Sequence, residues 1–564
     1  MEVSNADVEP RLGSAAPQDD TYSGVATFLY SSKTNGKVNI AGVCEILAAS
    51  EAFSFALSSS GRIYFKENGR LKSQLLDIET SIAELGMKVR GHNEFLDANP
   101  GDSNIYALSN ALDLLLSDKK LFNAAFDFPA ESARIFMRPI AIRSEGDEGY
   151  ELIVPYIRIY VGGIISISLP TVLGFEGATV QDVVCNEVNK SRCNINSVLC
   201  EKALHLACTE CQMAEMPLHE RIAHKKEFEA MINFALSAPE QIEFADEKLT
   251  VYELVNTNQF TLTDIARNLL SVVARAISLG ALKTRIRWLR KQYRDDSIGE
   301  YWHGKPIIYI SSHTRQENSS TENWGAHRRL VNSVMTRVHL TEDITHTDLA
   351  HVDMRNFDDF NNFYSESVSL MLASAQVEQQ IEKHNSYTFN NLTSDIQVLN
   401  EAAHFIQIFY SYASIGLDKC KTAIDVARLE LKILKFEESL LSAHKYGEIA
   451  KYIEEVKKGY HLATVCKVLH KKVETVRKAL ELDEKVASES STRRITIIFG
   501  IIASATLSPE LMQPLAKFLG FSYGDQIDKL VGISASIVGV ITFLIVVHYF
   551  SRSVRFITRM TGRD

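Results

Sequence analysis

The sequence lacks several features that would assign it to a common class of protein. Near the N-terminus there is no apolar stretch of about seven to fifteen residues, so we expect neither a secretory signal nor a transit peptide. Eight cysteines scattered over 564 residues exclude a secreted disulfide framework. With 60 basic and 70 acidic residues the net charge is −10, so no nucleic-acid partner is expected. No HExxH, P-loop or GxSxG motif is present, so no enzyme class is indicated.

The first two thirds of the chain predict an α+β cytoplasmic domain. Residues 1–22 are polar and are expected to form a disordered tail. Alternating apolar residues predict a mixed α/β domain over 23–180, with hairpin turns at Asn35-Gly36 and Asn68-Gly69, because such pairs readily adopt positive φ. Residues 181–363 predict a mostly helical cytoplasmic region with a few strands.

The pattern changes at about residue 364. From there to residue 493 Gly and Pro are almost absent, and apolar residues recur at intervals of three and four. This spacing predicts a stalk of long helices in a bundle or coiled coil. The residues that carry the pattern are Leu429, Ile433, Phe436, Leu440, Leu462, Val465, Leu469, Val473, Val476 and Leu480.

Two apolar segments follow the stalk. The first, Ile495 to Leu507, reaches only ~20 Å as a helix, whereas a bilayer core is ~30 Å thick. The second has no charge from Leu530 to Val547 and is long enough to span. Arginines flank the pair on both outer sides, which predicts a transmembrane hairpin over 494–550 and a basic cytoplasmic tail over 551–564. The expected spans are 495–515 and 530–550, and the alternative is a buried C-terminal helical hairpin.

This arrangement resembles the CorA-type divalent-cation transporters. "SPEL" at 508–511 is similar to the family's acidic loop after its first span, and "GVITFLIVVHYFSRSVRF" is similar to its second span and basic exit. The family's Gly-Met-Asn motif is absent, so magnesium selectivity is not carried over. The resemblance implies a prokaryotic inner-membrane homo-oligomer, usually a pentamer, with both termini cytoplasmic, the lipid bilayer as partner and a divalent cation as candidate cofactor.

Pore candidates follow from the first span. Hydroxyls of Thr506 and Ser508 and the carboxylate of Glu510 would form a ring that favours cations, and Ile498 and Ile502 would line the pore below it. The alternative is that Ser508 simply caps a short outer helix.

The cysteine-rich stretch suggests a metal site. Cys200, His205, Cys208 and Cys211 lie within a few helical turns, and the Cys208-x-x-Cys211 pair has the spacing of zinc ligands. The alternative is a set of small buried thiols.

A histidine- and arginine-rich stretch after the strand "KPIIYISS" suggests a ligand site. We expect a nucleotide-like ligand to be bound there by His313, Arg315, His327, Arg328 and Arg329. The alternatives are a surface loop and a metal-dependent hydrolase site formed by His346, Asp348, His351 and Asp353. A basic run at 283–296 predicts contact with lipid headgroups, a nucleotide or acidic patches, or a solvated helix face.

Together these features predict an oligomeric, CorA-like cation channel or transporter gated by a ligand that the cytoplasmic domain senses. The resemblance extends this to an antiviral effector, because CorA-like proteins occur in prokaryotic defence systems. The alternative is a membrane-anchored cytosolic enzyme or scaffold whose two spans serve only as an anchor.

Overall fold

The structure is a computed structural model of the full chain. It describes residues 20–34, 37–81, 86–122, 128, 130–145, 149–215, 217–254, 260–281, 304–341, 353–355, 359–383, 388–444, 447–459, 461–518, 534 and 538. The chain forms two compact units, of which unit 1 contains 1–416 and 431–469 and unit 2 contains 417–430 and 470–564.

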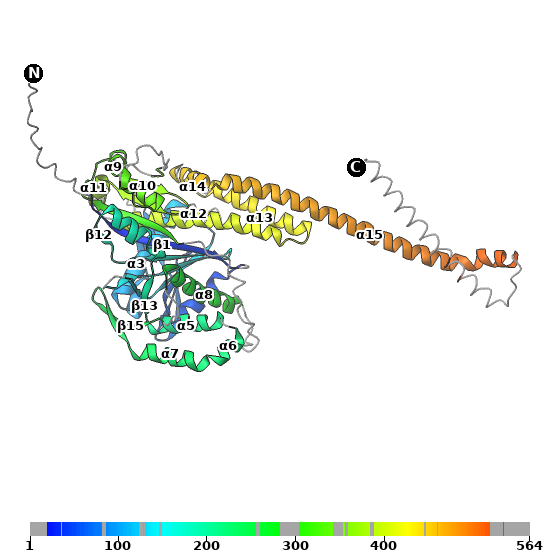
Figure 1. Ribbon diagram of the computed structural model, residues 1–564, viewed down its shortest axis with the longest axis horizontal. Coiled ribbons are helices and arrows are strands. Elements are labelled where there is room, and N and C mark those ends of the chain that lie inside the picture. Colours follow the sequence, from blue (N-terminus) through cyan, green and yellow to red (C-terminus); the bar gives the residue numbers. More distant parts are fainter. Residues whose placement is uncertain are drawn as a thin grey trace, which may run out of the picture. The chain divides into compact units, whose positions relative to one another are not determined.

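Unit 1 is built around a sheet of 11 strands (Figure 1). All the strand pairs in it are antiparallel except the parallel pair β16–β18. In sheet order the strands are β17 (Phe360–Tyr364), β18 (Ser369–Ala373), β16 (Lys305–His313), β1 (Tyr22–Lys33), β11 (Ile164–Pro170), β10 (Tyr156–Tyr160), β7 (Ser132–Met137), β2 (Phe53–Ser58), β3 (Arg62–Glu67) and β4 (Arg70–Leu75), with β12 (Phe175–Ala178) paired to β1.

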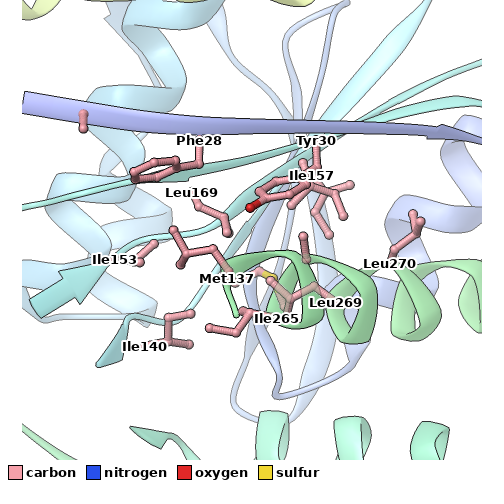
Figure 2. Packing of buried hydrophobic residues seen from close by; sticks show 14 of the residues in the cluster. Phe28, Tyr30, Met137, Ile140, Ile153, Ile157, Leu169, Ile265, Leu269 and Leu270 are labelled. Carbon is pink, nitrogen blue, oxygen red and sulfur yellow. The ribbon is translucent and has the colours of Figure 1, made fainter. Parts of the chain in front are cut away.

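The two faces of this sheet differ in chemistry. Successive side chains of a strand point to opposite faces, so Phe28 and Tyr30 of β1 enter one core and Leu29 enters another. On the first face, aliphatic side chains pack against α1 (Ile40–Ala49) and α8 (Leu262–Ala281). Figure 2 shows Ile265 and Leu269 of α8 beneath this face. The second face packs against α3 (Asp102–Leu121) and α12 (Phe389–Asp418), whose Asp118 and Glu401 contact Arg134 of the sheet.

The chain also contains a second sheet, a two-stranded sheet and further helices. A second sheet has the order β14 (Glu240–Phe244), β15 (Glu247–Glu253), β13 (Ile195–Cys200), β8 (Ile140–Ser144) and β9 (Glu151–Ile153), and β5 (Asp77–Ser81) pairs with β6 (Gly86–Arg90). The other helices are α2 (Asn93–Ala98), α4 (Val180–Asp182), η1 (Val183–Val188), η2 (Lys190–Arg192), α5 (Lys202–Glu215), α6 (Leu218–Ala223), α7 (Lys225–Ser237), α9 (Ser320–Ala326), α10 (Arg328–Thr336), α11 (Ala375–Lys383), α13 (Ala423–Ser442), α14 (Gly447–Gly459) and α15 (Leu462–Phe518).

One of the two predicted hairpins is confirmed. Asn68 and Gly69 have φ values of 49° and 77° and join β3 to β4. The other pair, Asn35-Gly36, lies outside the described residues, and the next described element after β1 is α1, whose first turn is capped by the Asn39 side chain.

Strands distant in sequence join the same sheet. β16, β17 and β18 extend the sheet that β1 begins, so the segments 23–180 and 181–363 belong to one compact unit. β18 lies where the sequence predicts only long helices. Those helices are present further along the chain as α12 to α15.

Unit 2 is helical in its described part. It contains the last residues of α12, the first residues of α13, and α15 from His470 onward. Salt bridges join the two helical segments: Lys472 Nζ lies 2.8 Å from Asp418 Oδ1, and Arg477 Nη1 lies 3.0 Å from Glu430 Oε2.

The predicted transmembrane fold is overturned. In the part of the chain that the structure describes, no helix is both long enough and apolar enough to cross a membrane. The first predicted span, 495–515, is the last third of α15 rather than a separate helix, and its apolar run is too short at ~20 Å. The second predicted span, 530–550, lies outside the described residues apart from two isolated positions.

Close approach of β1 and β16 gives the first prediction. Gly24 lies at the register shift between these strands, and a Cβ atom there would collide with the carbonyl oxygen of Tyr309. We expect Gly24→Ala to lower the free energy of unfolding of the full chain by ~2 kcal/mol or more in a denaturant titration. Gly162→Ala, where the added carbon meets nothing within 4 Å, is the control. Equal stability of the two variants would contradict the predicted clash.

Candidate functional site

The second face of the large sheet is polar although it is buried. The strand "YIRIY" places Ile157 and Ile159 in the aliphatic core, so its alternate residues Tyr156, Arg158 and Tyr160 face the other way. All five are buried. A strand with alternating residues usually exposes its polar side to water, but here helices cover that side. The polar groups must therefore find partners within the protein.

Two arginines of this face are neutralised by two carboxylates. Glu401 of α12 lies 2.8 Å from Arg134 Nη2 and 2.7 Å from Arg158 Nη1, both through Oε2. Tyr156 donates a hydrogen bond of 2.8 Å to the other oxygen, Oε1. Asp118 of α3 lies 2.5 Å from Arg134 Nη1 and 3.1 Å from Arg158 Nη2. We call these five residues the buried ion cluster, in which two positive and two negative charges balance.

The ionisation of Glu401 depends on the arginines. Its side chain is 0 % exposed, and burial alone would raise its pKa. The adjacent Arg134 and Arg158 guanidinium groups outweigh burial and hold the pKa of Glu401 below its ordinary value. The carboxylate is therefore charged at neutral pH, and α12 is tied to β7 and β10 by charge-assisted hydrogen bonds.

A cavity of about 310 Å³ lies beside the cluster. The α3 residues that line it are spaced three and four apart and so share one helical face, and the same holds for the α12 residues. This volume is at the lower end of the range of small-molecule sites, about 300–1,000 Å³. The lining residues are Val25, Thr27, Tyr106, Ser109, Asn110, Asp113, Leu114, Tyr156, Pro170, Thr171, Val172, Tyr309, Asn390, Thr393, Ser394 and Gln397.

Hydrogen bonds order the inner wall of the cavity. Tyr309 donates to Gln397 Oε1 at 3.0 Å, and Gln397 Nε2 donates to Ser168 Oγ at 3.0 Å. Tyr156 belongs both to this wall and to the buried ion cluster. The cavity and the cluster are therefore joined through one tyrosine and through α12.

Asp113 is the charged group of the cavity wall. Burial raises the pKa of Asp113 to about 6, although the hydrogen bond from Asn391 Nδ2 at 2.8 Å lowers it. The neighbouring Asp395 also raises it, and Asp395 is itself ion-paired with Lys120 Nζ at 2.5 Å. With its hydroxyl, amide and carboxyl groups the cavity can bind a small polar molecule.

Two of the predicted ligand-binding residues come together, but away from this cavity. The rings of His313 and His327 lie 4.3 Å apart between centroids, and both side chains are buried. His327 Nε2 must donate to the Arg315 carbonyl oxygen at 2.8 Å, so its Nδ1 accepts from the Tyr22 hydroxyl at 2.9 Å. His313 Nε2 donates to the Ala373 carbonyl at 3.1 Å. The pair joins β1, β16 and α10.

The three predicted arginines do not form a site with the histidines. Arg315 and Arg328 are exposed, and the Arg329 guanidinium donates to the Leu340 carbonyl and contacts His339. None of the five predicted residues lines the cavity. Of the alternative hydrolase residues, Asp353 accepts a hydrogen bond from Asn361, while His346, Asp348, His351 and the basic run at 283–296 lie outside the described residues.

The predicted zinc site is not formed. Cys200, His205, Cys208 and Cys211 are all buried, but no group of three or more His, Cys, Asp or Glu side chains in the described ranges is arranged to hold a metal ion. Burial raises the pKa of Cys200 to about 12 and that of Cys208 well above its ordinary value, so these thiols stay protonated.

The pore candidates fall on α15. Ile498 is 56 % exposed. The structure does not describe the side chains of the other four candidates, Ile502, Thr506, Ser508 and Glu510.

Sequence reasoning missed the cavity and the cluster. Arginines at alternate positions of two apolar strands, Arg134 and Arg158, were one available signal. Another was the polar series Asn390, Ser394, Gln397, Glu401 and His404 along one face of α12. Neither identifies its partner, because Arg158 and Glu401 are separated by 243 positions.

The first prediction from the site concerns Glu401. Replacing it with Gln leaves Arg134 and Arg158 with one carboxylate between them, so we expect the free energy of unfolding to fall by ~3 kcal/mol in a denaturant titration. The control is Glu438→Gln, because Glu438 is exposed on α13. A loss no greater than that of the control would contradict the role assigned to the cluster.

The second prediction from the site concerns the buried pair His313 and His327. Burial lowers the pKa of both His313 and His327 below their ordinary value, so the unfolded chain, with a pKa of about 6.5, binds more protons. Stability contributed by the pair is complete above about pH 6.5 and is lost as the pH falls toward the lower folded pKa values. We expect His327→Gln to reduce the slope of unfolding free energy against pH below about 6.5. An unchanged slope would show that His327 does not titrate on unfolding.

Comparison of the chain with known proteins identifies no similar protein. No protein-family profile, no curated protein and no solved structure matches the chain. The resemblance to CorA-type transporters therefore remains untested, and the geometry of unit 1 is the basis for assigning a function.

Proposed function

We propose that unit 1 is a sensor of a small polar molecule, which binds in the cavity and acts on the rest of the chain through α12. The observation that carries this proposal is that one face of α12 serves two purposes. Asn390, Ser394 and Gln397 line the cavity, and Glu401, one turn further along, enters the buried ion cluster. A ligand that contacts the first three therefore acts on the helix that the fourth holds in place.

In this proposal the cluster lets α12 occupy two discrete positions rather than a continuous range. Hydrogen bonds between Glu401 and its partners are short, and an intermediate displacement would leave buried charges without partners, which is costly. A ligand shifts the population between two positions of α12 when it binds one of them more tightly. The chain enters unit 2 directly from α12, since unit 1 contains this helix up to Gly416.

This proposal keeps one part of the function expected from the sequence, the sensing of a ligand. Cation transport, homo-oligomerisation, an antiviral role, a prokaryotic inner-membrane location and the alternative of a cytosolic enzyme or scaffold are expectations from the sequence and form no part of this proposal.

Hydrogen exchange of the full chain tests the proposal. The probes are glycerol, glucose, choline, its neutral isostere dimethylbutanol, and inorganic phosphate. We expect at least one probe to slow amide exchange in residues 390–404, because it would restrain the helix that lines the cavity. The effect should disappear in Ser109→Trp, where the indole occupies the mouth of the cavity.

Ile105→Trp is the matched control. Ile105 lies on the same helix one turn earlier, is 51 % exposed and does not line the cavity. This variant should respond to the probe as the parent does. If no probe changes exchange in 390–404, or if the two tryptophan variants respond alike, the cavity is not a ligand site that acts on α12.

A further inference from the structure

The charge on the wall of the cavity is negative. In the described part of the chain Asp113 is the only charged residue that lines the cavity, and no lysine or arginine lines it. The nearby basic groups already have carboxylate partners: Lys120 pairs with Asp395, and Arg134 and Arg158 pair with Asp118 and Glu401. A ligand therefore meets a carboxyl group without a competing cation.

Asp113 has capacity left for a ligand. Its Oδ1 accepts the hydrogen bond from Asn391, and no protein donor to Oδ2 is found among the described residues. Burial disfavours the charged carboxylate, as its raised pKa shows. A cation in the cavity would favour the ionised form, so binding of a cation and ionisation of Asp113 would strengthen each other.

The rest of the wall suits an organic cation better than a bare metal ion. Tyr106, Tyr156 and Tyr309 are among the lining residues, and an aromatic ring attracts a cation placed over its face. Amides and hydroxyls such as Asn110 and Ser394 supply further polar contacts. A phosphate group would meet a carboxylate and find no guanidinium or ammonium partner, which disfavours a nucleotide-like ligand in this cavity.

We propose that the cavity binds a small organic cation, an amine or quaternary ammonium compound, and that Asp113 is the residue that selects it. This inference rests on the proposed function, since it names the ligand class of the same cavity. The selectivity comes from one carboxylate set among tyrosine rings and neutral polar groups.

The test compares choline with dimethylbutanol, which has the same shape without the charge, by isothermal titration calorimetry on the full chain. We expect choline to bind at least about tenfold more tightly than dimethylbutanol, and Asp113→Asn to remove this preference. The control Asp97→Asn changes the net charge equally at an exposed position outside the cavity, and should leave the preference intact. Inorganic phosphate should not bind.

The pH dependence of choline affinity tests the same proposal on the protein without substitutions. Affinity for choline should fall as the pH drops below about 6, where Asp113 becomes protonated, while affinity for dimethylbutanol should not change. Among the residues that the structure describes, Asp395 on α12 is the acid that acts on Asp113, and the other titratable groups of the wall are Tyr106, Tyr156 and Tyr309.

The outcomes separate this inference from the proposed function. If neutral probes bind the cavity as tightly as choline, or if phosphate binds better, the cation inference is wrong and the sensor proposal stands. If choline binds but its preference survives in Asp113→Asn, Asp113 is not the selecting residue and the inference is also wrong. If none of the probes binds, both proposals fail together.

Discussion

Two buried arginines constrain the architecture of unit 1. Arg134 and Arg158 point from neighbouring strands toward the side of the sheet that α3 and α12 cover, and a buried guanidinium without a carboxylate costs several kcal/mol. Asp118 must therefore come from α3 and Glu401 from α12. This requirement sets the rotation and the position of both helices against the sheet. The Phe389–Asp418 helix can slide along the sheet only by breaking the cluster.

The cavity follows from the same constraint. On the opposite face, aliphatic side chains of the strands pack closely with α1 and α8, as protein interiors normally do (Figure 2). On the α12 face, side chains must satisfy directional hydrogen bonds, so they cannot be chosen only to fill space. Tyr309, Gln397 and Ser168 are linked in this way, and a polar space of about 310 Å³ remains beside them. One face of the sheet thus forms an aliphatic core, and the other contains the cavity.

In the proposed sensor, the same constraint links ligand binding in the cavity to movement of α12. Tyr156 lines the cavity and donates to Glu401, so a change in the cavity reaches the cluster through a single side chain. A buried charge that loses its partners is costly, so positions of α12 in which the cluster is broken are disfavoured. A helix held by such a cluster is suited to report whether a small molecule is present.

The sequence by itself determined the features that depend on neighbouring residues. Asn68-Gly69 specifies a tight turn because those two residues tolerate positive φ, and the scarcity of Gly and Pro after residue 364 predicts long helices. The same local reasoning failed where one signal fits two structures, as with the apolar run beginning at Ile495, which continues α15. Only the tertiary structure decided the site. Arg158 and Glu401 are 243 positions apart, and Asp113 meets the strands of the cavity wall only after α3 packs on the sheet. No periodicity along the chain encodes which distant charges will meet, because that depends on how the strands and helices pack together.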